Sequence, residues 1–141
     1  MSKAIGIDFG LKRTGIAITD DLCIIASPLT VVDSTKLMQF LSDLITKENI
    51  STLVLGYPTR LDGSDSHITE NVRILKSELE KNFLTVSVLF QDERYSSVES
   101  MKAIHKAGKK KQLKDKGLID KVSATIILQD YLETLNNVQM K

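Results

Sequence analysis

The first third of the chain consists of short apolar runs separated by brief polar turns. Residues 4–8, 15–19 and 23–32 are rich in Ile, Val and Ala, and the segments between them contain Gly or Asp. This pattern predicts three short strands. Because parallel neighbours need a crossover of about a dozen residues or more, connections this short predict an antiparallel meander.

A helical period follows the meander. Between residues 34 and 47 the apolar side chains recur at the spacing of one helix face, at Leu37, Phe40, Leu41, Leu44 and Ile45. A helix is therefore expected over about 34–47, with Asp33 and Ser34 as candidate N-cap residues. Residues 52–58 then form an uninterrupted apolar run that ends at Gly-Tyr-Pro, which predicts a central strand buried on both faces.

The second half of the chain continues to alternate helix and strand. A helical pattern ends near Asn82, residues 85–93 indicate a further strand, and residues 96–108 begin with the Ser-x-x-Glu spacing of a capped helix. The last helical pattern begins at Asp120. Right-handed crossovers would make the two later strands parallel to the first. The expected fold is α/β: a five-stranded mixed sheet, with strands 1 to 3 antiparallel, strands 1, 4 and 5 parallel, and helices on both faces.

Length and composition are those of a soluble globular protein. The 141 residues fit one domain spanning 1–141, and 42% of them are hydrophobic and 26% charged. No apolar run approaches the ~20 residues that cross a bilayer, so no membrane partner is expected and the cytoplasm is the default location. Cys23 is the only cysteine, which excludes an internal disulfide and a cysteine-based zinc site.

Carboxylates stand where the predicted parallel strands end. Asp8 closes the first strand, and Asp92 and Glu93 close the fifth. Ligands of open α/β sheets bind outside the carboxyl ends of the strands, and with one strand between them these positions would lie about 10 Å apart. Asp120 could join them if the last helix packs with its N-terminal end over the strand tips. Oxygen ligands of this kind suit Mg²⁺ or Mn²⁺.

Each acid taken alone also fits a simple structural role. Asp before a glycine turn is often a turn residue, and an acid at the start of a helix is favoured by the helix dipole. The pair at the end of the fifth strand could be a solvated strand end. Their joint placement at one sheet edge favours a functional site.

Basic side chains accompany the acids. Lys12, Arg13 and Arg94 flank them in sequence and could hold phosphate groups. The net charge is only +1, but one stretch is rich in lysine, at Lys106, Lys109, Lys110, Lys111, Lys114, Lys116 and Lys121. This stretch either contacts a nucleic-acid backbone without reading its sequence or forms a solvated loop. Tyr57 and Tyr95 are candidates for stacking on an unpaired base.

Four sequence blocks, in order and spacing, resemble the motifs of one family. They are IGIDFGLKRTGIAITD, LVLGYPTRLDGSDS, DERYSS and KGLIDKVSATIILQDYL. The family is the YqgF family, which is related to the Holliday-junction resolvases within the ribonuclease H-like superfamily. The resemblance implies a ribonuclease H-like fold and a metal-dependent nuclease that acts in maturation of the small-subunit ribosomal RNA precursor, with Holliday-junction resolvase activity also proposed.

The resemblance also implies roles for particular residues of this chain. The catalytic acids would be Asp8, Glu93 and Asp120. Asp92 remains an alternative metal ligand, because the sequence does not fix the strand phase, and the metal would be Mg²⁺ or Mn²⁺. The residues expected to contact nucleic acid are Lys12, Arg13, Arg94, Lys109, Lys110, Lys111 and Lys114.

Two other functions fit part of the sequence. One is a ribosomal RNA-binding assembly factor whose acids no longer catalyse. The other is a nucleotide-binding lobe, because IGIDFG followed by TG is similar to the phosphate hairpin of actin and sugar kinases; a chain this short supplies only one such lobe. The expected partner is precursor ribosomal RNA or branched DNA, and the expected state is a monomer or a weak homodimer.

Overall fold

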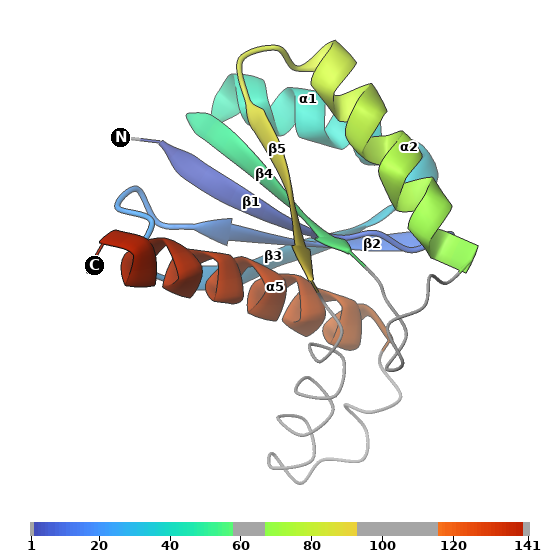
Figure 1. The fold of residues 1–141 in the computed structure, drawn as a ribbon. Helices are drawn as coiled ribbons and strands as arrows, with labels where there is room; N and C mark the ends of the chain where they lie inside the picture. Colours follow the sequence, from blue (N-terminus) through green and yellow to red (C-terminus); the bar gives the residue numbers. More distant parts are fainter. Residues whose placement is uncertain (1, 58–66, 93–115, 140–141) are drawn as a thin grey trace, which may run out of the picture.

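The computed structural model describes residues 2–57, 67–92 and 116–139 (Figure 1). Five strands form one sheet in the order β3-β2-β1-β4-β5. β1 pairs antiparallel with β2, and β2 with β3, whereas β4 is parallel to β1 and β5 is parallel to β4. The predicted mixed sheet is therefore confirmed. The strands are β1 Lys3–Asp8, β2 Arg13–Thr19, β3 Ala26–Asp33, β4 Ile50–Tyr57 and β5 Ser87–Asp92.

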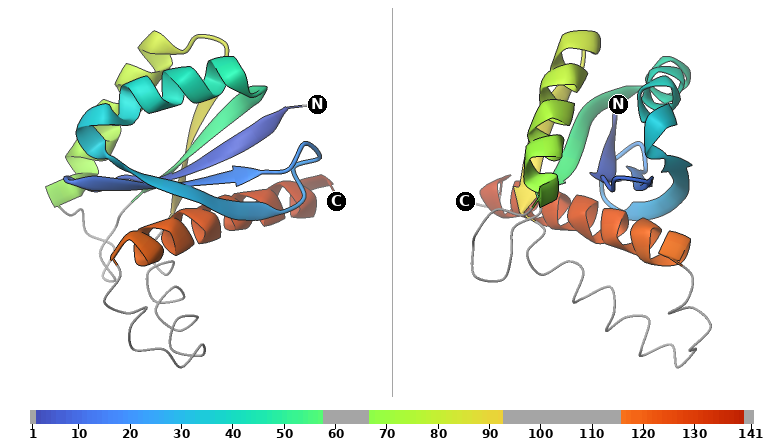
Figure 2. Two further views of the ribbon diagram at one scale, coloured as in Figure 1. Left: turned by 180° about the vertical axis from the view of Figure 1, so that it is seen from behind. Right: turned by 90° about the vertical axis from the view of Figure 1, so that its right-hand side faces the viewer.

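Helices cover both faces of the sheet, as predicted (Figure 2). On one face lie α1 Leu37–Lys47, which follows the short 3-10 helix η1 Ser34–Lys36, and α2 His67–Asn82. On the other face lies α5 Lys116–Gln139. None of the described helices is long and apolar enough to cross a membrane. The helix expected over residues 96–108 falls outside the described residues.

The face toward α1 and α2 is packed with large aliphatic side chains. Ile5 and Ile7 of β1 and Leu53 and Leu55 of β4 are fully buried there. Their two-residue spacing is that of strands with one side turned to a core. The helices contribute side chains at the positions that the 3.6-residue period predicts, namely Leu37, Leu41, Val72, Leu75 and Leu79.

The face toward α5 is lined instead with small side chains. A Cβ atom at Gly6 would come within 2.7 Å of both the carbonyl oxygen of Ala124 and the Cβ atom of Leu128. Because non-bonded carbon atoms sit about 3.5–4.0 Å apart, α5 can lie this close to β1 only where residue 6 has no side chain. The neighbouring strand positions that pack in the same cluster are Ala4, Ala17, Ala26 and Val54.

Several element boundaries differ from the sequence prediction by a few residues. β3 begins at Ala26 rather than at residue 23. The Asp20 carboxylate accepts hydrogen bonds from the amides of Ile24 and Ile25, at 2.8 and 3.2 Å, and holds that segment in a turn. α5 begins at Lys116, about one helical turn before the expected start at Asp120.

Asp33, one of the two predicted N-cap residues, stands at the N-cap of η1, but no side-chain hydrogen bond caps η1 or α1. Asp33 makes no side-chain cap hydrogen bond, and α1 follows η1 with Lys36 at its N-cap and no side-chain cap. The Ser34 hydroxyl instead donates to the carbonyl oxygen of Gly10, 2.5 Å away. The Ser34 hydroxyl therefore makes a tertiary hydrogen bond in place of a local helix cap.

The edge strand β3 contains Pro28, which has no backbone N–H. Pro28 stands opposite Ala17, and the register of β2 with β3 shifts between Ile16 and Ala17. The hydrogen-bond ladder at this edge is therefore irregular beside the proline.

Candidate active site

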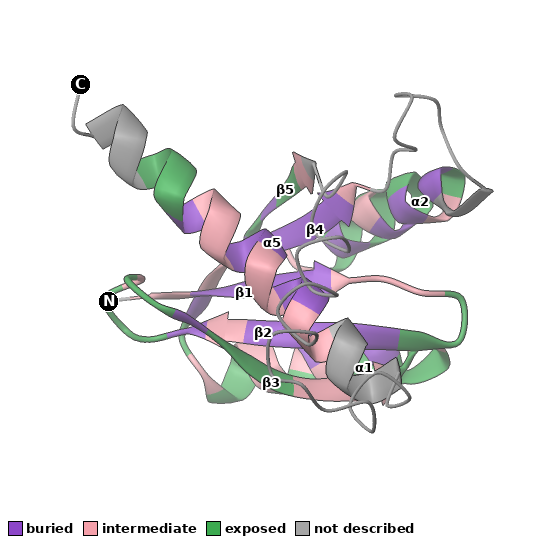
Figure 3. Ribbon diagram, turned by 90° about the horizontal axis from the view of Figure 1, so that it is seen from below, coloured by how far each residue is buried: buried purple, intermediate pink, exposed green. Residues whose placement is uncertain are grey.

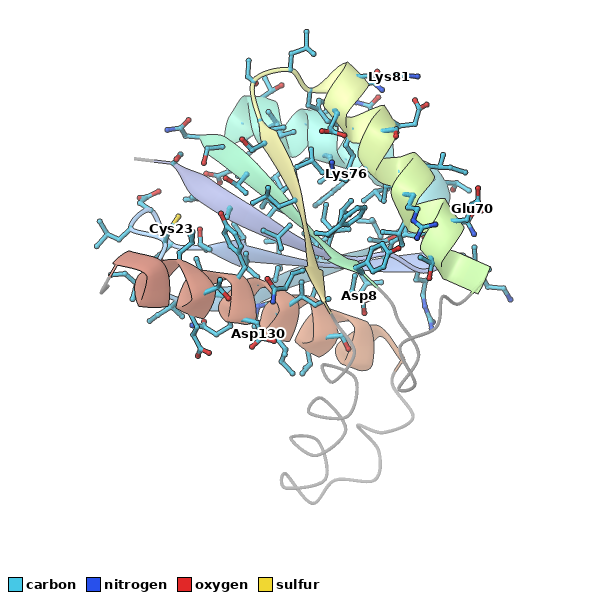
Figure 4. All side chains as sticks on the ribbon, viewed as in Figure 1. Asp8, Cys23, Glu70, Lys76, Lys81 and Asp130 are labelled. Atoms are coloured by element: carbon cyan, nitrogen blue, oxygen red, sulfur yellow. The ribbon has the colours of Figure 1, made fainter. Side chains whose placement is uncertain are left out.

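Asp8 is the last residue of β1 and is half-buried. Residues two apart on a strand share a face, so Asp8 belongs to the side of the sheet where Gly6 meets α5. Figure 4 shows Asp8 at the opposite end of the sheet from Cys23. The first predicted acid therefore stands at the strand ends, on the face that α5 covers.

The carboxyl ends of the three parallel strands meet at this edge. β1 and β4 are in register at Ile7 and Leu55, and β4 and β5 are in register at Tyr57 and Asp92. Asp8 and Asp92 thus end two strands that have β4 between them, which places their backbones about 10 Å apart. The structure brings these two predicted positions to one edge.

The long helix α5 runs with its N-terminal end toward the same edge (Figure 1). Near the amino end of β4, the Tyr131 hydroxyl interacts with the Thr52 side chain. Seven residues earlier in α5, Ala124 lies against Gly6, which is further along β1. The helix therefore passes the sheet in the direction opposite to the parallel strands.

This direction brings the third acid toward the first. Asp120 lies one helical turn before Ala124, a step of about 6 Å along the helix axis. Asp8 lies two residues after Gly6, a step of about 6.6 Å along the strand. The two steps have the same direction and similar length, so the backbone of Asp120 comes level with Asp8.

Two of the predicted phosphate-binding residues lie where the turn after β1 leads into β2. Lys12 and Arg13 are both exposed. The amide of Ser34 donates to the carbonyl oxygen of Lys12 at 3.0 Å, in addition to the bond from its hydroxyl to Gly10. A side chain at Gly10 would overlap the carbonyl oxygen of Arg13. Ser34, which the sequence suggested only as a helix cap, thus shapes this turn.

Tyr57 is engaged on the face of the sheet opposite Asp8. Its ring centroid lies 4.8 Å from that of Phe90 in an edge-on arrangement. Its hydroxyl accepts a hydrogen bond from Arg73 Nη2 of α2, 2.5 Å away. Tyr57 therefore links α2 to the strand ends on that face, and its role in base stacking stays a prediction.

Several predicted site residues fall outside the described part of the chain. Among the side chains that the structure does describe, no three His, Cys, Asp or Glu residues group closely enough to hold a metal ion. That part includes Asp8 but neither Glu93 nor the side chains of Asp92 and Asp120, so the metal site stays a prediction. The other undescribed candidates are Arg94, Tyr95, Lys109, Lys110, Lys111 and Lys114.

Comparison with known sequences identifies a family. The Holliday junction resolvase family RuvX matches residues 2–134. A protein from Phocaeicola vulgatus is 40% identical over 135 residues, which cover 95% of this chain and 97% of that protein. One from Flavobacterium psychrophilum is 41% identical over 133 residues, covering 94% and 97%. Both relatives are named as candidate pre-16S rRNA nucleases.

Two solved structures share this fold. The Fowlpox virus resolvase in complex with Holliday junction DNA has a TM-score of 0.60 at 16% identity, covering 94% of this chain and 98% of that chain. RuvC of T. thermophilus in complex with a Holliday junction substrate has a TM-score of 0.58 at 13% identity, covering 96% of each. The strand order and pairing described above agree with this ribonuclease H-like fold. On these grounds, the chain belongs to the RuvX (YqgF) family of Holliday junction resolvases.

Proposed function

We propose that this protein is a metal-dependent nuclease that hydrolyses phosphodiester bonds in structured nucleic acid, above all in the cytoplasmic maturation of the small-subunit ribosomal RNA precursor. The observation that carries the proposal is the convergence of Asp8 and the start of α5 at the carboxyl ends of the parallel strands. The names of the bacterial relatives support the substrate. The Holliday-junction complexes of the two solved structures make a branched DNA the second substrate to test.

The residues that would hold the metal are Asp8, Asp120 and one of the two acids at the end of β5, Asp92 or Glu93. Carboxylate oxygens are the ligands that Mg²⁺ and Mn²⁺ prefer. A bound ion would supply an activated water and would neutralise charge on the leaving oxygen. The task left to the chain is to keep the acids, and the phosphate between them, in position.

The phase of β5 supports Glu93 over Asp92 as that acid. Phe90 lies on the α2 face, where Lys76 Nζ is 5.5 Å from the centre of its ring. Gln91 therefore belongs to the α5 face, on which Asp8 also lies. An acid that follows Gln91 by two residues continues this phase, and in the sequence that acid is Glu93.

Exposed cations would hold the substrate around this centre. Lys12 and Arg13 lie on the turn that follows Asp8, close enough to contact phosphates next to the one that is cleaved. We assign the same backbone-binding role to Arg94, Lys109, Lys110, Lys111 and Lys114. Contacts of this kind add affinity without reading the base sequence.

A cleavage assay with purified protein tests the proposal. The substrates are a precursor of small-subunit ribosomal RNA and a four-way DNA junction, each with Mg²⁺, with Mn²⁺ and with chelator. We expect cleavage only with metal, and a loss of at least about 100-fold in Asp8→Asn, Asp120→Asn and Glu93→Gln, because several kcal/mol of charge stabilisation disappears. Binding of the substrate should persist in these variants.

Asp92→Asn and Asp43→Asn are the matched controls. Asp43 is an exposed acid on α1 whose carboxylate accepts a hydrogen bond from Gln39, so its loss should leave cleavage within about twofold. A stronger defect in Asp92→Asn than in Glu93→Gln would exchange the roles of these two acids. Binding of ribosomal RNA without turnover under any metal would favour the non-catalytic assembly factor.

A further inference from the structure

The turn between β1 and β2 exposes a large apolar side chain beside the proposed active site. Leu11 is 67% exposed, and it is followed by the exposed cations Lys12 and Arg13. Figure 3 shows this turn as a loop that projects past the end of β1, with exposed residues at its tip. Two residues, Phe9 and Gly10, separate Leu11 from Asp8, so their Cα atoms are no more than about 11 Å apart.

Hydrogen bonds from Ser34 hold this turn in shape. Its hydroxyl donates to the carbonyl oxygen of Gly10 at 2.5 Å, and it lies 2.8 Å from the Thr14 hydroxyl. A serine hydroxyl has only one proton. Because that proton is given to Gly10, the buried Thr14 hydroxyl must donate to Ser34. Thr14, Ser34 and Gly10 thus form a directed chain of hydrogen bonds.

The backbone closes the turn from a second side. The Ser34 amide donates to the Lys12 carbonyl oxygen at 3.0 Å, and Phe9 packs on the core beneath the turn. With Gly10 against the carbonyl of Arg13, both ends of the segment that presents Leu11 are fixed. The backbone that carries Leu11 therefore loses little conformational freedom when the side chain meets a ligand.

We propose that this turn is a rigid wedge, in which Leu11 inserts beside an unstacked base of the substrate while Lys12 and Arg13 hold the flanking phosphates. The ligand is a nucleic acid whose stacking is interrupted, at a branch point or a loop. Apolar side chains inserted between base steps open the stack in other nucleic-acid complexes. The distance from Asp8 limits the affected base to within about three base steps of the cleaved bond.

The inference rests on the proposed nuclease function, but it can be tested apart from cleavage. A DNA junction and an RNA hairpin are each labelled with 2-aminopurine, whose fluorescence rises when it unstacks, at the branch or in the loop. Binding is followed in the Asp8→Asn background, so that the substrate stays intact. We expect the fluorescence to rise on binding, and at least half of the rise to be lost in Leu11→Ser.

Leu84→Ser is the matched control for this substitution. Leu84 is 86% exposed but precedes β5, at the opposite end of that strand from the proposed site. Its loss should leave the fluorescence rise unchanged. With Asp8 intact, Leu11→Ser should slow cleavage of the junction or hairpin about tenfold, the equivalent of roughly 1.4 kcal/mol of transition-state stabilisation, and change cleavage of an unstructured strand less than twofold.

Ser34 provides a second variant that leaves Leu11 in place. Ser34→Ala removes the donor to Gly10, and we expect it to lose both the fluorescence rise and the preference for structured substrate. Ser34→Thr keeps a hydroxyl and should restore both. Thermal unfolding of the two variants separates this effect from a general loss of fold, because positioning is at issue only where both proteins are folded at the assay temperature.

The outcomes separate the wedge from the nuclease function. An equal fluorescence rise in Leu11→Ser and in its parent would overturn the wedge, even if the protein cleaves as proposed. A rise that depends on Leu11, together with an absence of cleavage by the parent protein with Asp8 intact, would support the wedge and contradict the nuclease function. A dependence seen with the hairpin alone, or with the junction alone, would support the wedge and identify which nucleic acid it opens.

Discussion

The face of the sheet beneath α1 and α2 is filled with Ile and Leu, whereas the face beneath α5 is lined with Ala and Gly. Bulky side chains bury much apolar surface and keep their helices at an ordinary distance. Small ones let a helix backbone come almost into contact with a strand, as Gly6 does with Ala124. The first face therefore supplies most of the stability, and the second fixes where the start of α5 stands relative to Asp8.

Truncating the aliphatic face should have the largest effect on stability. Leu41 of α1 is fully buried in that core. We expect Leu41→Ala to lower the free energy of unfolding by about 2–5 kcal/mol, since the lost side chain leaves a cavity. Urea unfolding measures this, and the cleavage rate per folded molecule should stay within about twofold of the parent. A rate that falls together with the stability would mean that this face also positions the site.

A substitution that fills the close contact between Gly6 and α5 should lower the stability less than Leu41→Ala does. It should lower the cleavage rate more. Gly6→Ala places a methyl group against α5, and overpacking of this kind costs about 1–3 kcal/mol. Displacing the helix by a fraction of an ångström moves Asp120 relative to Asp8. We expect the folded protein to cleave at least about tenfold more slowly, because small misplacements of reacting groups are expensive.

Ala17→Gly is the control for that substitution. Ala17 is fully buried in the same cluster, and its loss removes a methyl group without pushing on α5. The variant should lose a similar amount of stability but keep its cleavage rate. Equal rates in Gly6→Ala and Ala17→Gly would contradict the idea that the small residues set the site.

The C-terminal half of α5 can be tested through the pH dependence of the stability that Tyr131 contributes. Burial raises the pKa of its phenol above the ordinary value of 10.0, so the folded state binds this proton more tightly than the unfolded chain does. Its contribution is complete below pH 10.0 and is lost as the pH rises through the higher folded pKa. Tyr131→Phe should cost about 0.5–1.5 kcal/mol at neutral pH, through the lost interaction with Thr52, and should lessen the decline in stability above pH 10. Unfolding curves at pH 7 and in buffers above pH 10 check both parts.

The smallest effect on stability is expected from a substitution in the turn before β3, which belongs to neither packed face of the sheet. Hydrogen bonds from the amides of Ile24 and Ile25 lower the pKa of the Asp20 carboxyl below its ordinary value of 3.8. Its stabilising effect is therefore present above pH 3.8 and is lost as the pH falls through the lower folded pKa. The difference in unfolding midpoint between the parent and Asp20→Ala should be constant at neutral pH and shrink in acid, with cleavage unchanged. A difference independent of pH would show that the charge of Asp20 does not matter.

The sequence predicts the antiparallel meander and the position of Asp8 because both depend on local signals. Short connections dictate the meander, and a buried run that ends in Asp and Gly marks the end of a strand. The start of β3 could not be predicted in the same way, because the apolar side chains of Ile24 and Ile25 read as strand while their amides bond to Asp20. Hydrophobicity alone does not reveal where an amide donates.

The roles of Ser34 and Gly6 depend on contacts between distant parts of the chain. Serine is a common N-cap residue of helices, but the Ser34 hydroxyl donates a hydrogen bond to the carbonyl oxygen of Gly10, which is distant in the sequence. Gly6 reads as an ordinary small residue in a strand until the helix against it is known to be α5. In both positions the role depends on which distant segment packs against the residue, and the pattern of a single sequence does not predict that contact.

The proline in β3 has a consequence for the protein at high concentration. An open sheet edge is a template on which an extended segment of another molecule can add itself as a further strand. Pro28 carries no backbone N–H, and the register of β3 with its neighbour shifts beside it, so this edge strand is less regular as a template. Replacing Pro28 with a residue that can donate would make fibrous self-association during synthesis the first hazard to look for.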